Sequence, residues 1–417
     1  MPLILPRPWW DDVVPGPPPT TAPAPAPAGA RRQLALVALV QVLGLAVWFS
    51  ATAVVPGLRV AWDLSSTEAV WLTASVQIGF AVGAVTSSAL GLPDRFAPQR
   101  LMALCAAGAA LCTLLLAAVA DGLALAVPLR LATGVLLAGI YPLGMKLTAS
   151  WARPVDRGRA FGVLIGCLTL GSALPHLIVA LGGGPGLPWR RVLVGAALLA
   201  LVAAAVAALA VRPGPLLAVG ARPHARHVLA GARERGPRLA NLGYFGHMWE
   251  LYAFWTWLPA WLLAGGSTRT SLLTFLTVGG AGVAGSLLGG WASDRFGRSP
   301  AAVAALATSG ACCLLSPWLF AASPALLLPF LAVWGAAVIA DSGVFSAAVS
   351  ETSDQRYVGT ALTVQTAVGF ALTVLTIALV PVVAQATDWR WAFWLLVPGP
   401  LLGAVAMRRF RLVAPAR

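Results

Sequence analysis

Apolar runs of about twenty residues recur along the whole 417-residue chain, and short polar loops separate them. A helix needs about 20 such residues to cross the hydrocarbon core of a bilayer. The pattern predicts about twelve transmembrane helices, at residues 33–56, 69–91, 100–119, 123–147, 159–182, 190–211, 239–263, 271–293, 300–321, 325–349, 358–385 and 390–407. We therefore predict an all-α polytopic membrane protein.

One polar connection, residues 212–238, is longer than the others and is rich in Arg. It divides the predicted helices into two groups of six, so we expect two pseudo-symmetric six-helix bundles. The predicted regions are a disordered Pro-rich cytoplasmic tail at 1–32, an N-terminal bundle at 33–211, a cytoplasmic inter-bundle loop at 212–238, a C-terminal bundle at 239–410 and a cytoplasmic tail at 411–417. The first tail has too little apolar mass to form a core.

The distribution of charge predicts the orientation in the membrane. Only 10% of the residues are charged, too few to cover a soluble surface, yet the formal net charge is +14. Most of the 28 Lys and Arg residues fall in loops and tails on one side of the predicted membrane. By the positive-inside rule we expect a multi-pass protein of the cytoplasmic (inner) membrane with both termini in the cytoplasm. This pattern explains the charge without nucleic acid, which we do not expect as a partner.

Neither the cysteines nor the histidines form a recognisable chemical motif. All five cysteines lie in apolar spans, where packing is the simpler prediction than disulfide formation or metal binding. An H-E-x-x-H pair and a G-x-x-x-x-G-K-[ST] phosphate loop are both missing from the sequence. We expect no metal site, no cofactor and no catalytic residues, and we predict that the protein is not an enzyme.

Several motifs recur at an offset of 200 residues. Asp94-Arg95-Phe96 returns as Asp294-Arg295-Phe296, and Trp189-Arg190 returns as Trp389-Arg390. The copies fall at equivalent places in the two predicted bundles. Two similar halves around a central site are typical of alternating-access transporters.

The repeated loops also carry a family resemblance. The segment "GGWASDRFGRSP" resembles the signature loop of the major facilitator superfamily. Its matching residues are Gly290, Asp294, Arg295, Gly297 and Arg298. The first copy keeps Asp94 and Arg95 but has Ala97 where the glycine is expected, and "RLATGVLLAGIYP" resembles the family's arginine followed by spaced glycines. The resemblance covers roughly residues 33–410 and implies secondary transport, with a gating role for both loops.

Ionisable side chains inside predicted spans are candidates for the transport site. A charge at the bilayer centre costs about 2.5–3.5 kcal/mol on insertion scales, so a chain that keeps one there uses it by default. Glu250 lies near the middle of the seventh span, with His247 one turn earlier and Trp249 beside it, while Arg130 and Asp341 lie in the fourth and tenth spans. We expect these five residues to line a central cavity for substrate and protons.

The sequence thus predicts a secondary active transporter that moves a small solute by alternating access and is coupled to protons. Arg130 favours uptake of a small anion, whereas the aromatic seventh span favours efflux of an amphipathic compound or drug, and both remain open. A non-transporting receptor of the same fold is a further alternative. We expect a monomer in the lipid bilayer; the substrate, the direction and the coupling stoichiometry stay open.

Overall fold

The computed structural model describes residues 27–153, 156–183, 186–217, 233–354 and 358–413. Within these ranges the chain is helical and contains no β-strand. Most of the predicted tails at 1–32 and 411–417, and of the predicted loop at 212–238, lies outside the described residues. The predicted all-α, polytopic fold is confirmed.

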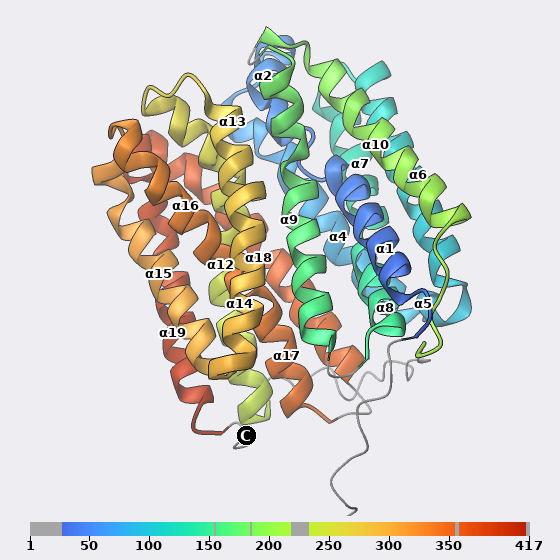
Figure 1. Ribbon diagram of the computed structural model, residues 1–417. Helices are drawn as coiled ribbons and strands as arrows, with labels where there is room; N and C mark the ends of the chain where they lie inside the picture. The colour runs from blue at the N-terminus through green and yellow to red at the C-terminus, as the bar shows by residue number, and fades with distance from the viewer. Residues whose placement is uncertain (1–26, 154–155, 184–185, 218–232, 355–357, 414–417) are drawn as a thin grey trace, which may run out of the picture.

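The first half of the chain builds one group of helices, on the right in Figure 1. Its elements are α1 (Ala30–Gly44), η2 (Leu45–Val47), η3 (Thr52–Val54), α2 (Val55–Trp62), α3 (Ser66–Ala69), α4 (Trp71–Ala89), α5 (Leu92–Arg95), α6 (Pro98–Val119), α7 (Leu123–Leu137), α8 (Tyr141–Trp151), α9 (Arg157–Leu181) and α10 (Trp189–Leu209).

The second half builds the other group, on the left in the same view. Its elements are α12 (Arg235–Ala264), α13 (Thr270–Thr274), the π-helix η7 (Phe275–Ala281), α14 (Gly282–Phe296), α15 (Arg298–Leu319), α16 (Pro324–Ala340), α17 (Ser342–Thr352), α18 (Val358–Ala386), η8 (Trp389–Leu396) and α19 (Pro398–Phe410).

Eleven helical segments of the described chain are long and apolar enough to cross a membrane. The remaining predicted span, 239–263, corresponds to α12, which has 30 residues but is less apolar. Its polar residues Asn241, His247 and Glu250 are all buried inside the protein. Helix α12 therefore spans the molecule through its interior, packed against α18 and α19.

The fourth span of each half is broken at an equivalent place. A turn at residues 138–140 separates α7 from α8, and a turn at Asp341 separates α16 from α17. The intact helices before these turns cross a neighbour closely in each half, α4 against α7 and α14 against α16. At the second crossing a Cβ on Gly289 would collide with the carbonyl oxygen of Ala340. Small residues let membrane helices approach in this way.

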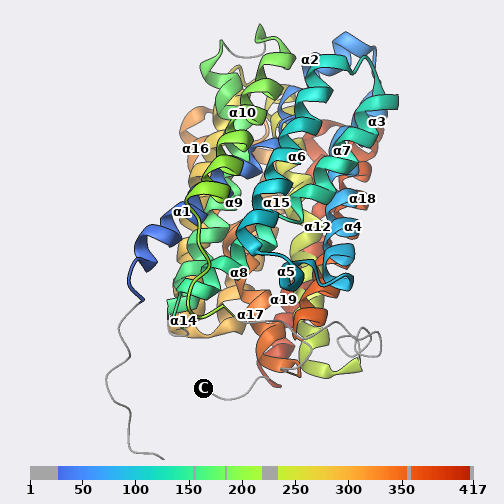
Figure 2. The same cartoon turned by 90° about the vertical axis from the view of Figure 1, so that its right-hand side faces the viewer.

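The two halves meet along two pairs of helices. Helix α4 packs along α18, and α9 packs along η7 and α14. Figures 1 and 2 show the helices of both halves running roughly along one common direction. A seam of this kind leaves room for a site between the halves, as the repeat predicts.

Candidate transport cavity and gates

A cavity of about 670 Å³ lies between the two halves. The first half contributes walls from α4, α5, α8 and α9, and the second half from α12, α17 and α18. Hydroxyl-bearing side chains from both halves line it, among them Tyr141, Tyr244, Ser342, Ser346, Thr363 and Thr366. At one end it reaches α5, where Asp94, Arg95 and Lys146 line it. The volume is in the range of small-molecule sites.

Aromatic rings from both halves pack together at the other end of the cavity. Phe80 and Phe370 line the cavity with ring centroids 4.4 Å apart, and Tyr252 lies 5.1 Å from Phe370. Trp48 stacks on Phe80 at 4.8 Å and is fully buried. We call these four residues the aromatic barrier. Offset and tilted stacking at such distances is favourable, so the barrier holds the halves together there.

His247 is the candidate residue that lines the cavity. Its Nε2 lies 2.8 Å from Ser342 Oγ, and its Nδ1 lies 2.8 Å from Asp341 Oδ1. The turn between α16 and α17 places Asp341 and Ser342 next to α12. Asp341 is 1% exposed and stands behind the imidazole, so the two ionisable groups form one buried pair that reaches the cavity through His247.

Glu250 does not line the cavity, contrary to the prediction. Its carboxylate accepts hydrogen bonds from Ser309 Oγ at 2.8 Å, Trp334 Nε1 at 2.8 Å and Cys313 Sγ at 3.2 Å. These donors belong to α15 and α16, so the side chain points into the second half. The i, i+3 spacing from His247 suggested a shared face, but the two side chains reach different neighbouring helices.

Arg130 also lies away from the cavity wall, contrary to the prediction. Its guanidinium is fully buried and donates to the carbonyl oxygens of Leu72 at 3.0 Å, Val47 at 2.9 Å and Trp48. A buried arginine can pair with a carboxylate, with backbone carbonyls or with an anionic ligand, and the structure shows backbone carbonyls. They belong to the irregular segment after α1 and to the start of α4. Arg130 therefore braces the backbone that carries Trp48 of the aromatic barrier.

Trp249 does not line the cavity either, and Asp341 lies behind His247, so His247 alone of the five residues predicted to line the cavity does so. The indole of Trp249 donates to the carbonyl oxygen of Leu395 at 2.9 Å, inside the second half. The aromatic residues that line the cavity include Phe80, Tyr252 and Phe370, which the charge-based search missed. Only their pairing across the two halves distinguishes them from ordinary core residues, and this pairing cannot be read from one chain position.

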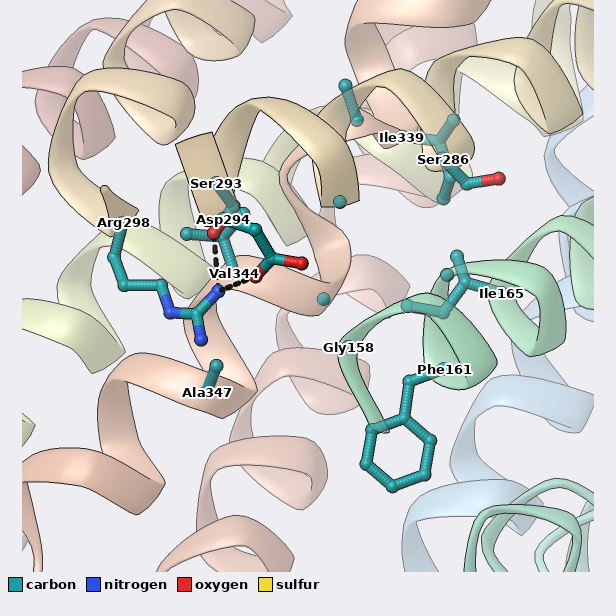
Figure 3. A pocket seen from close by; sticks show the side chains of 14 residues that line it. Gly158, Phe161, Ile165, Ser286, Ser293, Asp294, Arg298, Ile339, Val344 and Ala347 are labelled. Atoms are coloured by element: carbon teal, nitrogen blue, oxygen red, sulfur yellow. Dashed lines mark hydrogen bonds and ion pairs between the residues drawn. The ribbon is translucent and has the colours of Figure 1, made fainter. Parts of the chain in front are cut away.

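The second-half loop is held by a network of charges. Arg298 donates to Ser293 Oγ at 2.7 Å and Asp294 Oδ1 at 3.2 Å, and it reaches Glu351 of α17 at 3.0 Å. Figure 3 shows this arginine beside a small cavity of about 70 Å³ with α9 on the opposite side. A Cβ on Gly158, in the first turn of α9, would lie 3.0 Å from Asp294 Oδ2.

The carboxylate of Asp294 therefore lies close to the positive N-terminal end of α9, a helix of the first half. The other motif residues of this loop are described by their positions alone. Gly290 borders the same small cavity, Arg295 is exposed at the end of α14, and Gly297 has φ 92° in the tight turn before α15.

The first-half loop lies at the mouth of the main cavity instead. Asp94 pairs with Lys146 of α8, and Lys146 also donates to the carbonyl oxygen of Pro93 at 2.7 Å. Arg95 is exposed and lines the mouth. The two loops that the sequence predicts as gates thus occupy different environments: one lies in a closed seam and the other borders open space.

Two helical halves, a cavity between them and a signature loop in each half define the architecture of a secondary membrane transporter. The sequence profile of the Major Facilitator Superfamily matches residues 37–278 and 240–417, and the chain belongs to this family. A comparison with curated proteins finds no match.

Among solved structures, the fold is similar to that of the xylose transporter XylE from E. coli in a partially occluded inward open conformation. The TM-score is 0.71 at 15% sequence identity, and the match covers 92% of this chain and 99% of that chain. The similarity concerns the fold.

Proposed function

We propose that the protein is a proton-coupled secondary transporter that moves a small solute across the cytoplasmic membrane by alternating access. The observation that carries this proposal is the cavity between the halves, with His247 in its wall and Asp341 paired behind it. Such a pair can change its protonation where a substrate binds. The membrane family and the two-half fold support transport as the general activity.

The conformation corresponds to an inward-facing state if the basic loops are cytoplasmic. The cavity reaches the loop of Asp94 and Arg95, on the side that the positive-inside rule assigns to the cytoplasm. The aromatic barrier lies at the other end and closes the cavity toward the periplasmic side. For the outward-facing state the barrier separates and the cytoplasmic ends close, and a ligand shifts this equilibrium only by binding the two states unequally.

The proton step uses two groups that touch each other. When the imidazole of His247 is protonated, both ring nitrogens carry a proton: Nδ1 forms an ion pair with Asp341 Oδ1 at 2.8 Å, and Nε2 can donate to Ser342 Oγ. When the imidazole is neutral, one of its ring nitrogens becomes an acceptor, and the hydroxyl of Ser342 must turn if it is to donate there. A change in protonation therefore alters the hydrogen bonds that the cavity offers to a solute, which couples proton and solute binding.

The cavity favours an uncharged or cationic amphipathic solute over a small inorganic anion. Arg130, which suggested an anion, spends its donors on backbone carbonyls. The charged residues that line the cavity in the described chain are Asp94, Arg95 and Lys146 at its mouth and His247 deeper inside. Hydroxyl groups supply the other polar contacts and aromatic rings supply apolar surface, which suits a solute with both apolar and hydrogen-bonding parts.

Proton movement in proteoliposomes tests the proposal. Solutes that raise the Tm of the purified protein are added to vesicles with an entrapped pH-sensitive dye and an imposed pH gradient. We expect solute-dependent proton movement in the wild type and its loss in His247→Gln and Asp341→Asn. The matched control is His176→Gln, which changes a buried histidine of α9 that does not line the cavity. Solute flux without proton movement in the wild type would contradict the coupling.

A further inference from the structure

Lys146 is the only lysine in the sequence, and the other 27 of the 28 Lys and Arg residues are arginines. It lies on α8, half-buried in the wall at the mouth of the cavity, with 20% of its side chain exposed. A lysine differs from arginine in being a compact point charge with three donors on a flexible stem. Because the chain uses lysine only here, we looked for a contact that an ammonium group makes better than a guanidinium.

The repeat offset shows what the first loop lacks. In the second half Arg298 bridges Asp294 and Glu351. At the positions 200 residues earlier, Arg298 is replaced by Pro98 and Glu351 by Trp151. Neither replacement can form an ion pair. The bridge that fixes the second loop therefore cannot exist in the first.

The backbone of the first loop is rearranged as well. Gly297 adopts φ 92°, a conformation that favours glycine, whereas its counterpart Ala97 has φ −60°. The left-handed residue of the first loop is Gly91, at φ 62°, before α5. This change lets α5 turn its carbonyl and carboxylate groups toward α8, which lies beside it in both views (Figures 1 and 2).

Lys146 meets both of these groups. Its ammonium donates to Asp94 Oδ1 and to the carbonyl oxygen of Pro93. An ammonium can address two acceptors on adjacent residues of a tight turn, whereas a planar guanidinium has a fixed fork. The lysine thus supplies from α8 a positive charge beside Asp94, in place of the arginine that is missing at position 98.

We propose that Lys146 is the positioning residue of the first gate: it replaces the missing loop arginine and holds Asp94 within the first half while the cytoplasmic mouth is open. This inference rests on the proposed alternating access. Across the mouth lies the start of α18, where Gly359, Thr360 and Thr363 line the opposite wall. By symmetry with Asp294 and α9, the closed state brings Asp94 to the N-terminal end of α18. Lys146 competes with that contact and so favours the open mouth.

Distances between two spin labels across the mouth test this proposal in the full chain. The labels are placed at Phe96→Cys and Gly359→Cys after replacement of the five native cysteines. Phe96 is 57% exposed, and a Cβ on Gly359 meets no atom within 4 Å. Cys313 is replaced by Ser so that Glu250 keeps a donor. Pulsed electron resonance then measures the fraction of protein in the short-distance, closed-mouth state.

In Lys146→Gln we expect the ratio of closed to open mouth to rise about two- to fivefold, the effect that a partly exposed ion pair supports. The exchanged pair Asp94→Lys with Lys146→Asp restores the ion pair of the open mouth but would bring a cation to the positive end of α18 in the closed state, so its ratio falls to that of the wild type or below it. Arg100→Gln, another exposed basic residue near this loop, is the control and leaves the ratio unchanged.

Two results would overturn the account at different levels. If the wild type shows both distances but Lys146→Gln has the wild-type ratio, Lys146 does not position the gate. If the wild type shows one distance in the presence and absence of a pH gradient, the proposed alternating access itself fails. An exchanged pair that behaves like Lys146→Gln also contradicts the proposal, because charge complementarity would then have no part in it.

Discussion

Replacement of Arg130 by Met separates a bracing role from a transport role. The substitution keeps an unbranched apolar stem but removes the donors to the carbonyl oxygens of Leu72, Val47 and Trp48. The site is fully buried, so water cannot replace these donors without entering the bundle. Hydrogen bonds inside membrane proteins contribute about 0.6–2 kcal/mol each. Three of them amount to roughly 3 kcal/mol of lost stability.

A difference of this size corresponds to about a hundredfold change in the folding equilibrium. The assay is the Tm of the purified protein in detergent, measured beside solute flux in vesicles. We expect a clear fall in Tm for Arg130→Met and a smaller fall for Arg130→Lys, because an ammonium can still satisfy some of the carbonyls. We expect the solute flux per folded molecule to fall by a smaller factor than the folding equilibrium constant.

The reasoning is refuted if Arg130→Met keeps the wild-type Tm and loses all flux. That result would mean that the guanidinium serves the substrate or the proton and that its backbone contacts are incidental. Arg190→Met is a useful comparison, because this arginine donates to the carbonyl oxygen of Ala117 but is an exposed residue. Its loss should lower the Tm far less.

Three further predictions concern other parts of the molecule. Glu250→Gln places an amide N–H₂ among three donors, so we expect a loss of about 1–3 kcal/mol of stability with proton-coupled flux retained; loss of coupling at unchanged Tm would return Glu250 to the proton path. Gly289→Val should prevent close packing of α14 on α16 and lower the yield of folded protein, whereas Gly280→Ala, where a Cβ meets no atom within 4 Å, should not. Ser342 contacts His247 and His247 contacts Asp341, which is the sequence of contacts in a hydrolase triad. If these contacts serve as a proton relay, a fluorophosphonate probe should leave Ser342 unlabelled. Stoichiometric labelling of Ser342 would indicate an enzyme.

The membrane fold could be predicted from the sequence because its physical cause is local. Each span must be apolar over its full length, and the repeated Asp94 and Asp294 motifs mark equivalent helix ends in the two halves. Helix α12 shows where this signal weakens. It is buried by other helices and tolerates polar residues, so its composition reports its neighbours and not the lipid.

The site could be predicted only in part. The cost of a buried charge singled out Glu250, Arg130 and His247 as cavity residues, and the structure gives each of them specific protein partners while only His247 lines the cavity. This cost does not say whether the partner is a substrate, a side chain or a backbone carbonyl, since each of these can satisfy a charge. That choice depends on helix rotation and on breaks such as the one at Asp341, which follow from packing between segments far apart in sequence.

Lys146 is a site residue that the sequence features could have identified, although the prediction did not include it. Its uniqueness among the basic residues, and the loss of Arg298's counterpart at Pro98, are both visible in the sequence. The connection between them requires α8 to lie beside α5. The structure shows that these helices are neighbours, and the repeat then indicates that Lys146 stands in for the arginine missing at position 98.

The most direct test of alternating access is the reactivity of one cysteine in the cavity from each face of a sealed vesicle. Thr366 lines the cavity, so Thr366→Cys in the cysteine-free chain presents a thiol there. We expect a membrane-impermeant methanethiosulfonate to label it from both faces, with rates that a pH gradient changes in opposite directions. Labelling from one face alone, whatever the gradient, would show that the cavity never opens to the other side.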